Sequence, residues 1–479
     1  MKNSQSCKET DFKGKKVLVF GLGLLGGGVA TTNWLLKPGA KVTVTDLKDK
    51  KALFQSLKKI KGKAVLSLGG HKESDVEAND IIVVNPDVSI NNKYVQLAFK
   101  LGKQIENEAT IFLKNWQKPV VAITGTRGKT TTTNWVNHFL KAKYKSSVAG
   151  NSYENPFLKI LDKKSKLDCV ALEIPSFALE FFDKLVPSSD VAVITNIYQD
   201  HLNRHGTPKD YALTKANIFK NQSSAQHLIL NFDNEWTKFF IKQKPKAQVW
   251  FFSDKTLPEK LNGVYVSGNK VCLQNRGEKK AVLRVEVFSK VWGRHNVLNL
   301  LASSLAANLS GMSWSGIQKR IKNLPQIPFR QETIFENGRL RIINDTTATS
   351  PDGGAVAVER FASPSTILIA GGTDRQLNYE KWARVVLKKI KKENIVLLSG
   401  SATQKMRALI GKVEVFDSLE ECLRAALLKA GQYNKSVLLF SPAAKSFEKF
   451  KNEYDRGEQF NDLVGKLTKK ESKIGEKKR

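Results

Sequence analysis

The 479-residue sequence predicts an α/β fold of three domains, each built on a mainly parallel sheet covered by helices. Short apolar runs alternate with helical segments along most of the chain, and most of these runs open into a glycine-rich or small polar loop. One glycine-rich loop follows residues 15–20, a second follows residues 120–124, and a proline-containing linker at 324–330 precedes a last series of such units. These observations favour Rossmann-like first and last domains around a central mononucleotide-binding domain of the phosphate-loop type.

The bulk composition is that of an ordinary globular protein, with 41% hydrophobic and 26% charged residues. The four cysteines lack the paired spacing of a zinc site or a disulfide framework, which fits a reducing cytosol. The N-terminus is polar, without the apolar core of a secretory signal. Residues 17–36 carry no charge, but glycines interrupt them and argue against a membrane span. We therefore expect a cytoplasmic protein without membrane insertion.

The formal net charge of +33 raises the alternative of a nucleic-acid-binding protein. Lysine is spread along the whole chain, however, and its local excess is confined to the tail 469–479. No base-stacking or zinc-finger pattern accompanies it. We interpret the charge as a solvated lysine-rich surface that favours anionic small ligands, and we expect no nucleic-acid partner.

The first domain, predicted to span residues 1–117, opens with a buried strand at 15–20 that runs into the loop GLGLLG at 21–26. A helix follows to Leu36, then a second strand at 41–45 that ends in Asp46. This is a GxGxxG fingerprint with an acid about twenty residues on, which formally predicts a dinucleotide site. The physical content is narrower, because tight glycines and a helix N-terminus bind any diphosphate.

The central domain, predicted at 118–325, is organised around the segment VVAITGTRGKTTTTN at 120–134. Strand, glycine-rich turn, Lys-Thr and helix are the layout of a phosphate-binding loop. Lys129 is placed to reach the outer phosphates of a nucleoside triphosphate, and Thr130 to hold Mg²⁺ through its hydroxyl. Ile123 stands where the usual pattern has its first glycine. The alternative is an ordinary strand–turn–helix corner with a solvated lysine.

Two further central strands end in ionisable residues. The strand at 168–174 is interrupted by Glu173, and the strand at 190–197 is followed by His201. Because ligands of open parallel sheets sit at the carboxyl ends of strands, Thr130, Glu173 and His201 are expected in one crevice. Lys215 lies in a helix that begins at Thr207-Pro208, and its composition alone describes a solvated lysine.

The last domain, predicted at 326–467, has four apolar strands that each open into a small polar loop, at 340–344, 366–370, 395–398 and 436–440. They indicate a second doubly wound sheet with a ligand crevice. We expect the basic tail 468–479 to lack regular structure.

Seven segments in order resemble the muramyl peptide ligases: TGTRGKTTT, LEIPSF, NIYQDHLNRHGTPKDYALTKANIF, GRHNVLNLLA, PFRQE, INDTTATSP and SPAAKSF. The resemblance covers nearly the whole chain, to about Gly457, and it accounts for Ile123, because these ligases lack the first glycine of the usual pattern. It implies a monomeric, ATP-dependent amide ligase that adds D-glutamate to UDP-N-acetylmuramoyl-L-alanine. ATP would phosphorylate the terminal carboxylate, and the amino group of glutamate would attack the resulting acyl phosphate.

The resemblance also assigns residues to roles. ATP would be bound by Gly125, Thr126, Arg127, Gly128, Lys129, Thr130, Thr131, Asn296, Asn299, Arg330 and Asp345. Two Mg²⁺ ions would be held by Thr130, Glu173, His201 and a carbamylated Lys215, and the catalytic residues would be Lys129, Glu173, His201 and Lys215. Carbamylation requires a neutral amine, so a lowered lysine pKa belongs to this hypothesis. The uridine diphosphate sugar would be bound by Gly23, Leu24, Leu25, Gly26, Asp46 and Asn151.

The amino-acid site of the last domain departs most from the family. Thr349, Arg375 and Ser446 are expected to bind the amino acid. Thr347 stands where the family commonly has a lysine, and Glu453 where it has an aromatic residue. L-glutamate or another amino acid is therefore an open alternative within the family. A nicotinamide-dependent dehydrogenase is a remote one that rests on residues 21–26 alone.

Overall fold

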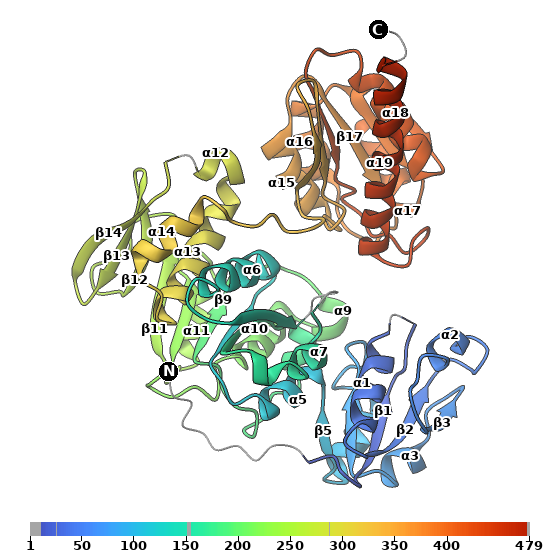
Figure 1. Ribbon diagram of the computed structural model, residues 1–479, viewed down its shortest axis with the longest axis vertical. Helices are drawn as coiled ribbons and strands as arrows, with labels where there is room; N and C mark the ends of the chain where they lie inside the picture. Colours follow the sequence, from blue (N-terminus) through green and yellow to red (C-terminus); the bar gives the residue numbers. More distant parts are fainter. Residues whose placement is uncertain (1–10, 25, 151–154, 287, 477–479) are drawn as a thin grey trace. The chain divides into compact units, whose positions relative to one another are not determined.

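The computed structural model describes residues 11–24, 26–150, 155–286 and 288–476, and it confirms the α/β class, with three mainly parallel sheets flanked by helices (Figure 1). The chain forms two compact units, Met1–Pro325 and Gln326–Arg479. The first unit carries two of the sheets and the second carries one. The boundary predicted between residues 117 and 118 falls between the last helix of the first sheet region and the first strand of the second.

The first sheet is entirely parallel, with the order β3-β2-β1-β4-β5. Its strands are β1 (Lys16–Phe20), β2 (Lys41–Asp46), β3 (Val65–Leu68), β4 (Ile81–Val84) and β5 (Gln104–Glu106). Its helices are α1 (Gly27–Leu36), α2 (Phe54–Leu57), α3 (Glu73–Glu77), α4 (Lys93–Lys100) and α5 (Glu108–Asn115). The chain leaves β1 toward β2 and returns on the other side to β4, so a ligand crevice is expected at the carboxyl ends of β1 and β4.

The second sheet has the order β14-β13-β12-β11-β10-β9-β6-β8-β7, parallel except for the hairpin strands β13 and β14. Its strands are β6 (Val120–Thr124), β7 (Ser146–Gly150), β8 (Cys169–Glu173), β9 (Val191–Ile194), β10 (His227–Asn231), β11 (Gln248–Ser253), β12 (Gly263–Ser267), β13 (Lys270–Asn275) and β14 (Glu278–Arg284). β6, β8 and β9 are buried along their whole length, as near-continuous apolar runs predict for parallel strands covered on both faces.

The helices of this region are α6 (Lys129–Leu140), α7 (Phe157–Leu161), α8 (Ser176–Leu179), α9 (Leu202–His205), α10 (Pro208–Ala216), α11 (Thr237–Lys242), α12 (Phe288–Trp292), α13 (Arg294–Leu309) and α14 (Trp314–Ile321). α6 packs against α13 on one side of the sheet. Thr207 caps α10 through its side chain and proline occupies the first turn, as the sequence predicts. One apolar core continues from the first sheet into the second, where Phe112 of α5 meets Phe157 of α7.

The third sheet has the order β15-β16-β20-β17-β18-β19, with only β15 antiparallel to its neighbour. Its strands are β15 (Glu332–Glu336), β16 (Leu340–Asn344), β17 (Thr366–Gly371), β18 (Ile395–Leu398), β19 (Glu414–Phe416) and β20 (Ser436–Phe440). Its helices are α15 (Pro351–Phe361), α16 (Glu380–Lys389), α17 (Ser401–Ile410), α18 (Leu419–Ala430) and α19 (Glu453–Glu476). The tail departs from expectation, because α19 continues to Glu476. Lysine and glutamate are good helix formers, and no proline interrupts the segment.

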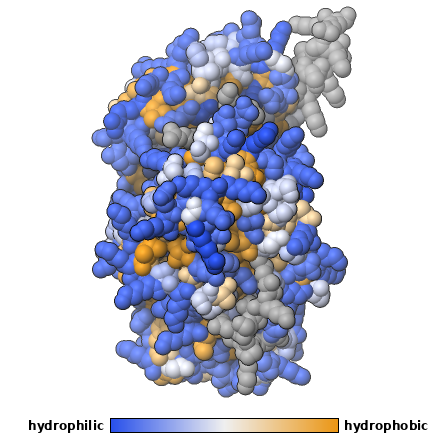
Figure 2. Space-filling model, turned by 90° about the vertical axis from the view of Figure 1, so that its left-hand side faces the viewer, coloured by the Kyte–Doolittle hydropathy of each residue, from blue (hydrophilic) through white to orange (hydrophobic). Residues whose placement is uncertain are grey.

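Hydrophilic residues dominate the face drawn in Figure 2, and hydrophobic ones form scattered patches among them. This distribution fits a lysine-rich solvated surface. Within the described ranges, no helix combines the length and apolar character needed to cross a bilayer.

A buried ion pair ties β5 to α5 in the first unit. Lys114 Nζ lies 2.6 Å from Glu106 Oε1, and their side chains are only 8% and 0% exposed. Removing one partner of such a pair leaves the other charge buried without compensation, which costs about 3–5 kcal/mol.

We expect Lys114→Met to destabilise the first unit by about this amount, because Glu106 loses its cation. Thermal and urea unfolding would measure the loss. The matched control is Lys279→Met, which removes the exposed pair of Lys279 with Glu259 and should leave the unfolding midpoint unchanged. Equal midpoints for both variants would contradict a structural role for the buried pair.

Candidate active site

The phosphate loop connects β6 to α6 and begins and ends with a glycine in the left-handed region, Gly125 at φ 143° and Gly128 at φ 80°. Gly128 is the N-cap of α6, and no described side chain caps that end. The first turn of the helix therefore directs backbone N–H groups and positive potential toward the loop, as an anion site requires.

The two glycines are needed because other elements press directly on the loop. A Cβ at Gly125 would overlap the hydroxyl of Thr195, which follows β9. A Cβ at Gly128 would overlap the side-chain oxygen of Asn299 in α13. The loop is thus enclosed between the carboxyl end of β9 and the first turns of α13, and only glycine fits at either contact.

Hydrogen bonds from the segment after β9 hold the loop in shape. Thr126 N donates to Asn196 O and Arg127 N to Asn196 Oδ1, both at 2.9 Å. Thr195 Oγ1 donates to Arg127 O at 2.7 Å. The sequence reasoning missed Thr195 and Asn196, although their position at a strand's carboxyl end was an available signal.

Lys215 is buried, with 1% of its surface exposed, so the expectation from composition of a solvated lysine was wrong. Its Nζ donates to Thr124 Oγ1 at 3.3 Å and lies over the ring of Tyr211 at 4.8 Å. Burial, reinforced by the positive charge of Lys129, lowers the pKa of Lys215 well below its ordinary value. Glu173 and Asp200 oppose that shift, so both carboxylates act electrostatically on this amine.

Two of the predicted residues, Lys129 and Glu173, lie in the loop and at the end of the strand beside it, and His201 lies in the segment that follows β9. Glu173 is 3% exposed at the end of β8, where it is paired in register with Ile123 of β6. Lys129 Nζ donates to Thr126 O at 3.0 Å within the loop. His201 has φ 51° and its Nε2 lies 3.8 Å from Asp200 Oδ2. Asp200 was not predicted, although it directly precedes His201 in the sequence.

The donors present fit Mg²⁺ only in combination with a substrate. Within the described part of the chain, no three His, Cys, Asp or Glu side chains converge on a metal position. The Glu173 carboxylate and the Thr130 hydroxyl supply hard oxygen ligands, the type that Mg²⁺ prefers. Mg²⁺ commonly takes one or two protein ligands and completes its shell with phosphate oxygens and water. The residues therefore match a nucleotide-dependent ion.

Of the two predicted asparagines of α13, Asn299 lies against the phosphate loop and Asn296 is bonded to Asn299. Asn299 Nδ2 donates to Asn296 Oδ1 at 2.8 Å, and Thr132 Oγ1 donates to Asn299 Oδ1 at 3.4 Å. Both asparagines are nearly buried. Their contact with the N-terminal turns of α6 places them beside the nucleotide loop, and their assignment to the adenine remains a prediction.

In the first glycine loop, Asp46 holds the backbone. Its Oδ2 accepts bonds from Leu22 N at 2.8 Å and Gly23 N at 2.9 Å, and its Oδ1 accepts from Lys48 N at 2.9 Å. Gly23 and Gly26 have φ of 64° and 93°, and the side chain of Leu24 is exposed. The predicted residues Leu25 and Asn151 lie outside the described residues.

The close contact between α1 and the glycine loop that follows β1 occurs at Gly28, two residues after the fingerprint. A Cβ there would overlap the carbonyl oxygens of Gly21 and Leu22. The sequence fingerprint assigns the last glycine role to Gly26, where a Cβ would meet open space.

The second unit buries Asp345 after β16, with 5% exposed. Ser441 Oγ donates to its Oδ2 at 2.8 Å and Gln331 N to its Oδ1 at 3.1 Å. Burial raises the pKa of Asp345 to about 7, against these bonds and the nearby Arg330 and Arg360.

The residues of this unit that are predicted to bind the amino acid differ in their exposure to solvent. Arg375 is exposed, Thr349 is half-buried, and Ser446 is 2% exposed. Ser446 Oγ has no hydrogen-bond partner within the described chain, as expected of a group that meets a ligand. Thr347 Oγ1 donates to Phe329 O at 2.8 Å.

Arg456, which was not predicted from the sequence, binds the two loops that follow β16 and β20. It is fully buried, and its guanidinium donates to the carbonyl oxygens of Thr346, Ala444 and Lys445. The two loops that carry Thr349 and Ser446 are thereby held on one arginine.

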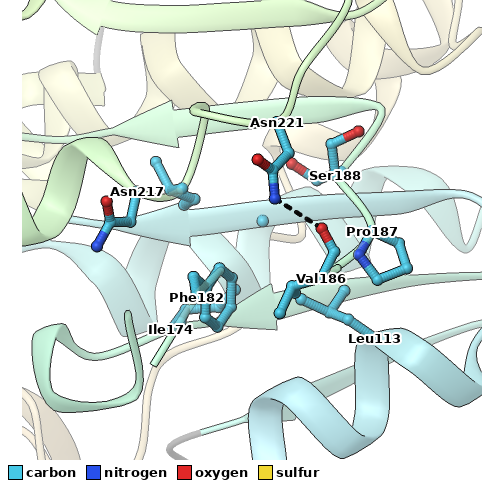
Figure 3. Close-up of a pocket in the computed structure, with 11 residues that line it drawn as sticks. Leu113, Ile174, Phe182, Val186, Pro187, Ser188, Asn217 and Asn221 are labelled. Carbon is cyan, nitrogen blue, oxygen red and sulfur yellow. Dashed lines mark hydrogen bonds between the residues drawn. The ribbon is translucent and has the colours of Figure 1, made fainter. Parts of the chain in front are cut away.

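The cavity drawn in Figure 3 is lined by residues of α5 and β6 and of the segments that follow β8 and α10. It is lined mainly by apolar side chains, with Asn221 directed toward Val186 O at 2.9 Å. Its volume of about 10 Å³ accommodates about one water molecule. None of the described site residues lines it, so we assign it no role in the site.

Comparison with known proteins matches both regions of the first unit. Residues 15–107 match the family model "Mur ligase MurD-like, N-terminal domain", and residues 123–307 match "Mur ligase middle domain". A protein of Roseiflexus sp. (strain RS-1) named UDP-N-acetylmuramoylalanine–D-glutamate ligase is 33% identical over 467 residues, covering 95% of this chain and 99% of that one. A protein of the same name from Caldanaerobacter subterraneus subsp. tengcongensis is 34% identical over 463 residues, with the same coverage of each chain.

Solved structures share the fold. UDP-N-acetylmuramate-alanine ligase MurC from Thermotoga maritima has a TM-score of 0.57 at 20% identity, covering 95% of this chain and 100% of that one. MurF ligase from Thermotoga maritima, solved in complex with ADP, has a TM-score of 0.56 at 18% identity, covering 90% and 96%. With relatives above 30% identity over nearly their full length, the chain belongs to the Mur ligase family, with an N-terminal domain of the MurD-like type.

Proposed function

We propose that the protein is an ATP-dependent ligase that joins D-glutamate to UDP-N-acetylmuramoyl-L-alanine, in the cytoplasmic stage of peptidoglycan synthesis, and that it acts as a monomer. The named relatives support the substrates. The observation that carries the chemistry is the meeting of Lys129, Glu173 and the buried Lys215 around one phosphate loop.

The reaction begins with transfer of the γ-phosphoryl group of ATP to the terminal carboxylate of the uridine nucleotide. A carboxylate is a poor electrophile, and the acyl phosphate carries a leaving group. The amino group of glutamate then attacks the acyl carbon, the C–O bond to phosphate breaks, and an amide and inorganic phosphate are released. Lys129 and the N-terminus of α6 meet the negative charge on the transferring phosphoryl group.

Thr130 and Glu173 would hold one Mg²⁺, and His201 and Lys215 a second beside the acceptor carboxylate. Bound Mg²⁺ supplies charge neutralisation at the phosphoryl oxygens. Lys215 would first form a carbamate: its neutral amine bonds to the carbon of CO₂ and loses one proton, which turns a cation into an anionic ligand. The lowered pKa of Lys215 supports this step, because only the neutral amine reacts.

The other assignments follow the family resemblance. The first glycine loop, with Gly23, Leu24, Gly26 and Asp46, would bind the uridine diphosphate, together with Leu25 and Asn151. In the second unit, Arg330 and Asp345 would contact ATP, and Thr349, Arg375 and Ser446 the incoming amino acid. The unpartnered, buried hydroxyl of Ser446 supports the last assignment.

A second candidate is the same ligation with L-glutamate. It stays open because Thr347, whose hydroxyl donates to Phe329 O, stands where the family commonly has a lysine. A dehydrogenase is disfavoured, because it rests on the first glycine loop alone and gives no role to Lys129, Glu173 or the buried Lys215.

Phosphate release with UDP-N-acetylmuramoyl-L-alanine, ATP, Mg²⁺ and each glutamate enantiomer tests the proposal. We expect turnover with D-glutamate and little with L-glutamate. The reverse preference would establish the second candidate, and no release with either enantiomer would refute the ligase assignment for this nucleotide.

Lys129→Ala should reduce ATP-dependent turnover by about 10²–10³-fold or more, because a cation at the transferring phosphoryl group is lost. The affinity for UDP-N-acetylmuramoyl-L-alanine, measured by calorimetry, should stay near that of wild type, since the glycine loop proposed to bind it lies at the first sheet. Lys141→Ala, at the exposed opposite end of α6, is the control. Loss of uridine nucleotide binding in Lys129→Ala would contradict this division of sites.

Lys215→Ala should lower turnover by about 10²-fold or more by removing the carbamate, and added short carboxylates should restore part of it. Because carbamate formation needs the neutral amine, wild-type activity at limiting CO₂ should fall as the pH is lowered through the pKa of Lys215. Lys209→Ala, on the exposed start of the same helix, serves as control. Wild-type rates in Lys215→Ala would exclude the carbamate role.

A further inference from the structure

Arg204 links the central sheet to the first sheet through all three nitrogens of its guanidinium. It lies in α9, three residues after His201. Its Nε donates to Glu180 Oε1 at 2.6 Å and its Nη2 to Glu180 Oε2 at 2.8 Å. On the other side, Nη2 donates to Val88 O at 2.9 Å and Nη1 donates to Pro86 O.

Glu180 completes the connection from the central side. Its Oε2 also accepts a bond from Ile90 N at 3.2 Å. The side chains of Arg204 and Glu180 are 14% and 5% exposed, so the pair is largely removed from water. A planar guanidinium satisfies the carboxylate and the carbonyls at once, which an ammonium group cannot do.

The loop held in this way is part of the predicted first-sheet crevice. Residues 85–90 follow β4, whose neighbour β1 opens into the first glycine loop. Asn85 Nδ2 donates to Gly21 O, the first residue of that loop. Arg204 therefore binds the 85–90 segment, which contacts the proposed uridine nucleotide site through Asn85.

The other end of the connection reaches the phosphate loop. His205, next to Arg204, places its Nε2 3.1 Å from Ser176 Oγ, three residues after Glu173. The ring of His205 lies 5.1 Å from that of Tyr211, whose hydroxyl accepts a bond from Thr126 Oγ1 at 3.3 Å. Contacts thus run from one glycine loop to the other through α9.

We propose that Arg204 and Glu180 form an interdomain clasp that positions the acceptor carboxylate of the first-sheet ligand against the phosphate loop. This inference rests on the proposed function, since it concerns the approach of two substrates bound to different sheets. The rate of such a reaction depends steeply on geometry, and a misplacement of about 1 Å costs about 10²-fold. Arg204 is a positioning residue that need not touch either substrate.

A second cross-sheet ion pair in the same unit provides a matched comparison. Nζ of Lys37, the C-cap of α1, lies 2.5 Å from Oδ2 of Asp162, the C-cap of α7. Its side chains are 62% and 43% exposed, so water competes for both charges and the pair contributes little. It joins the same two sheet regions without reaching either glycine loop.

The test compares Arg204→Lys with Lys37→Gln in the full-length chain. Arg204→Lys keeps the positive charge and loses the two-pronged guanidinium contact with Glu180, so we expect kcat to fall about 10–10²-fold. The dissociation constants of a non-hydrolysable ATP analogue and of UDP-N-acetylmuramoyl-L-alanine should each change less than about threefold, since neither loop loses a direct contact. Lys37→Gln should match wild type in all three quantities.

Arg204→Ala with added guanidinium ion extends the test, because the ion should restore part of kcat by restoring that contact. Wild-type kcat in folded Arg204→Lys, or a fall in melting temperature with kcat per folded molecule unchanged, would overturn the clasp and leave a structural pair. Inactivity of wild type and Lys37→Gln alike would refute the proposed function, and the clasp with it.

Discussion

The enclosure of the phosphate loop between β9 and α13 is the constraint on which the rest of the central site depends. Thr195 and Asn299 approach so closely that Gly125 and Gly128 cannot carry a side chain. Because β6 lies between β8 and β9, the residues that follow those two strands necessarily surround the loop. Rigid positioning of the loop backbone is what phosphoryl transfer requires, since most of its catalysis is positioning and electrostatics.

Burial of Lys215 and the positive charge of Lys129 both make the protonated form of Lys215 unfavourable. Two like charges, one without water, favour the neutral amine, and Glu173 and Asp200 compensate only in part. A buried amine of this kind is more often neutral, and therefore nucleophilic, than the protonated amine of a surface lysine. The same burial logic applies to Asp345 in the second unit, whose raised pKa reflects lost solvation near arginines.

The predicted site residues of this chain are distributed over three separate sheets, and buried or nearly buried arginines connect loops within each unit. In the first unit, the clasp of Arg204 with Glu180 joins the β4 loop to the central site. In the second unit, Arg456 holds two loops from beneath. Both use guanidinium groups that are largely or fully removed from water to bind backbone carbonyls, a task that suits a planar donor with five N–H groups. The net charge of +33 adds a general attraction for anionic ligands.

The α/β class, most strands that frame the sites and the phosphate loop could be predicted from the sequence, because apolar runs and glycine turns act over a few residues. The sequence also identified Glu173 as an acid ending a buried strand. The burial of Lys215 depends on the folded chain, since its environment includes Thr124, 91 positions away. The contacts of Arg204 likewise could not be predicted, because its partners Pro86, Val88 and Glu180 come from other segments. Pairing and solvation depend on which remote residues meet, and local pattern carries no record of that.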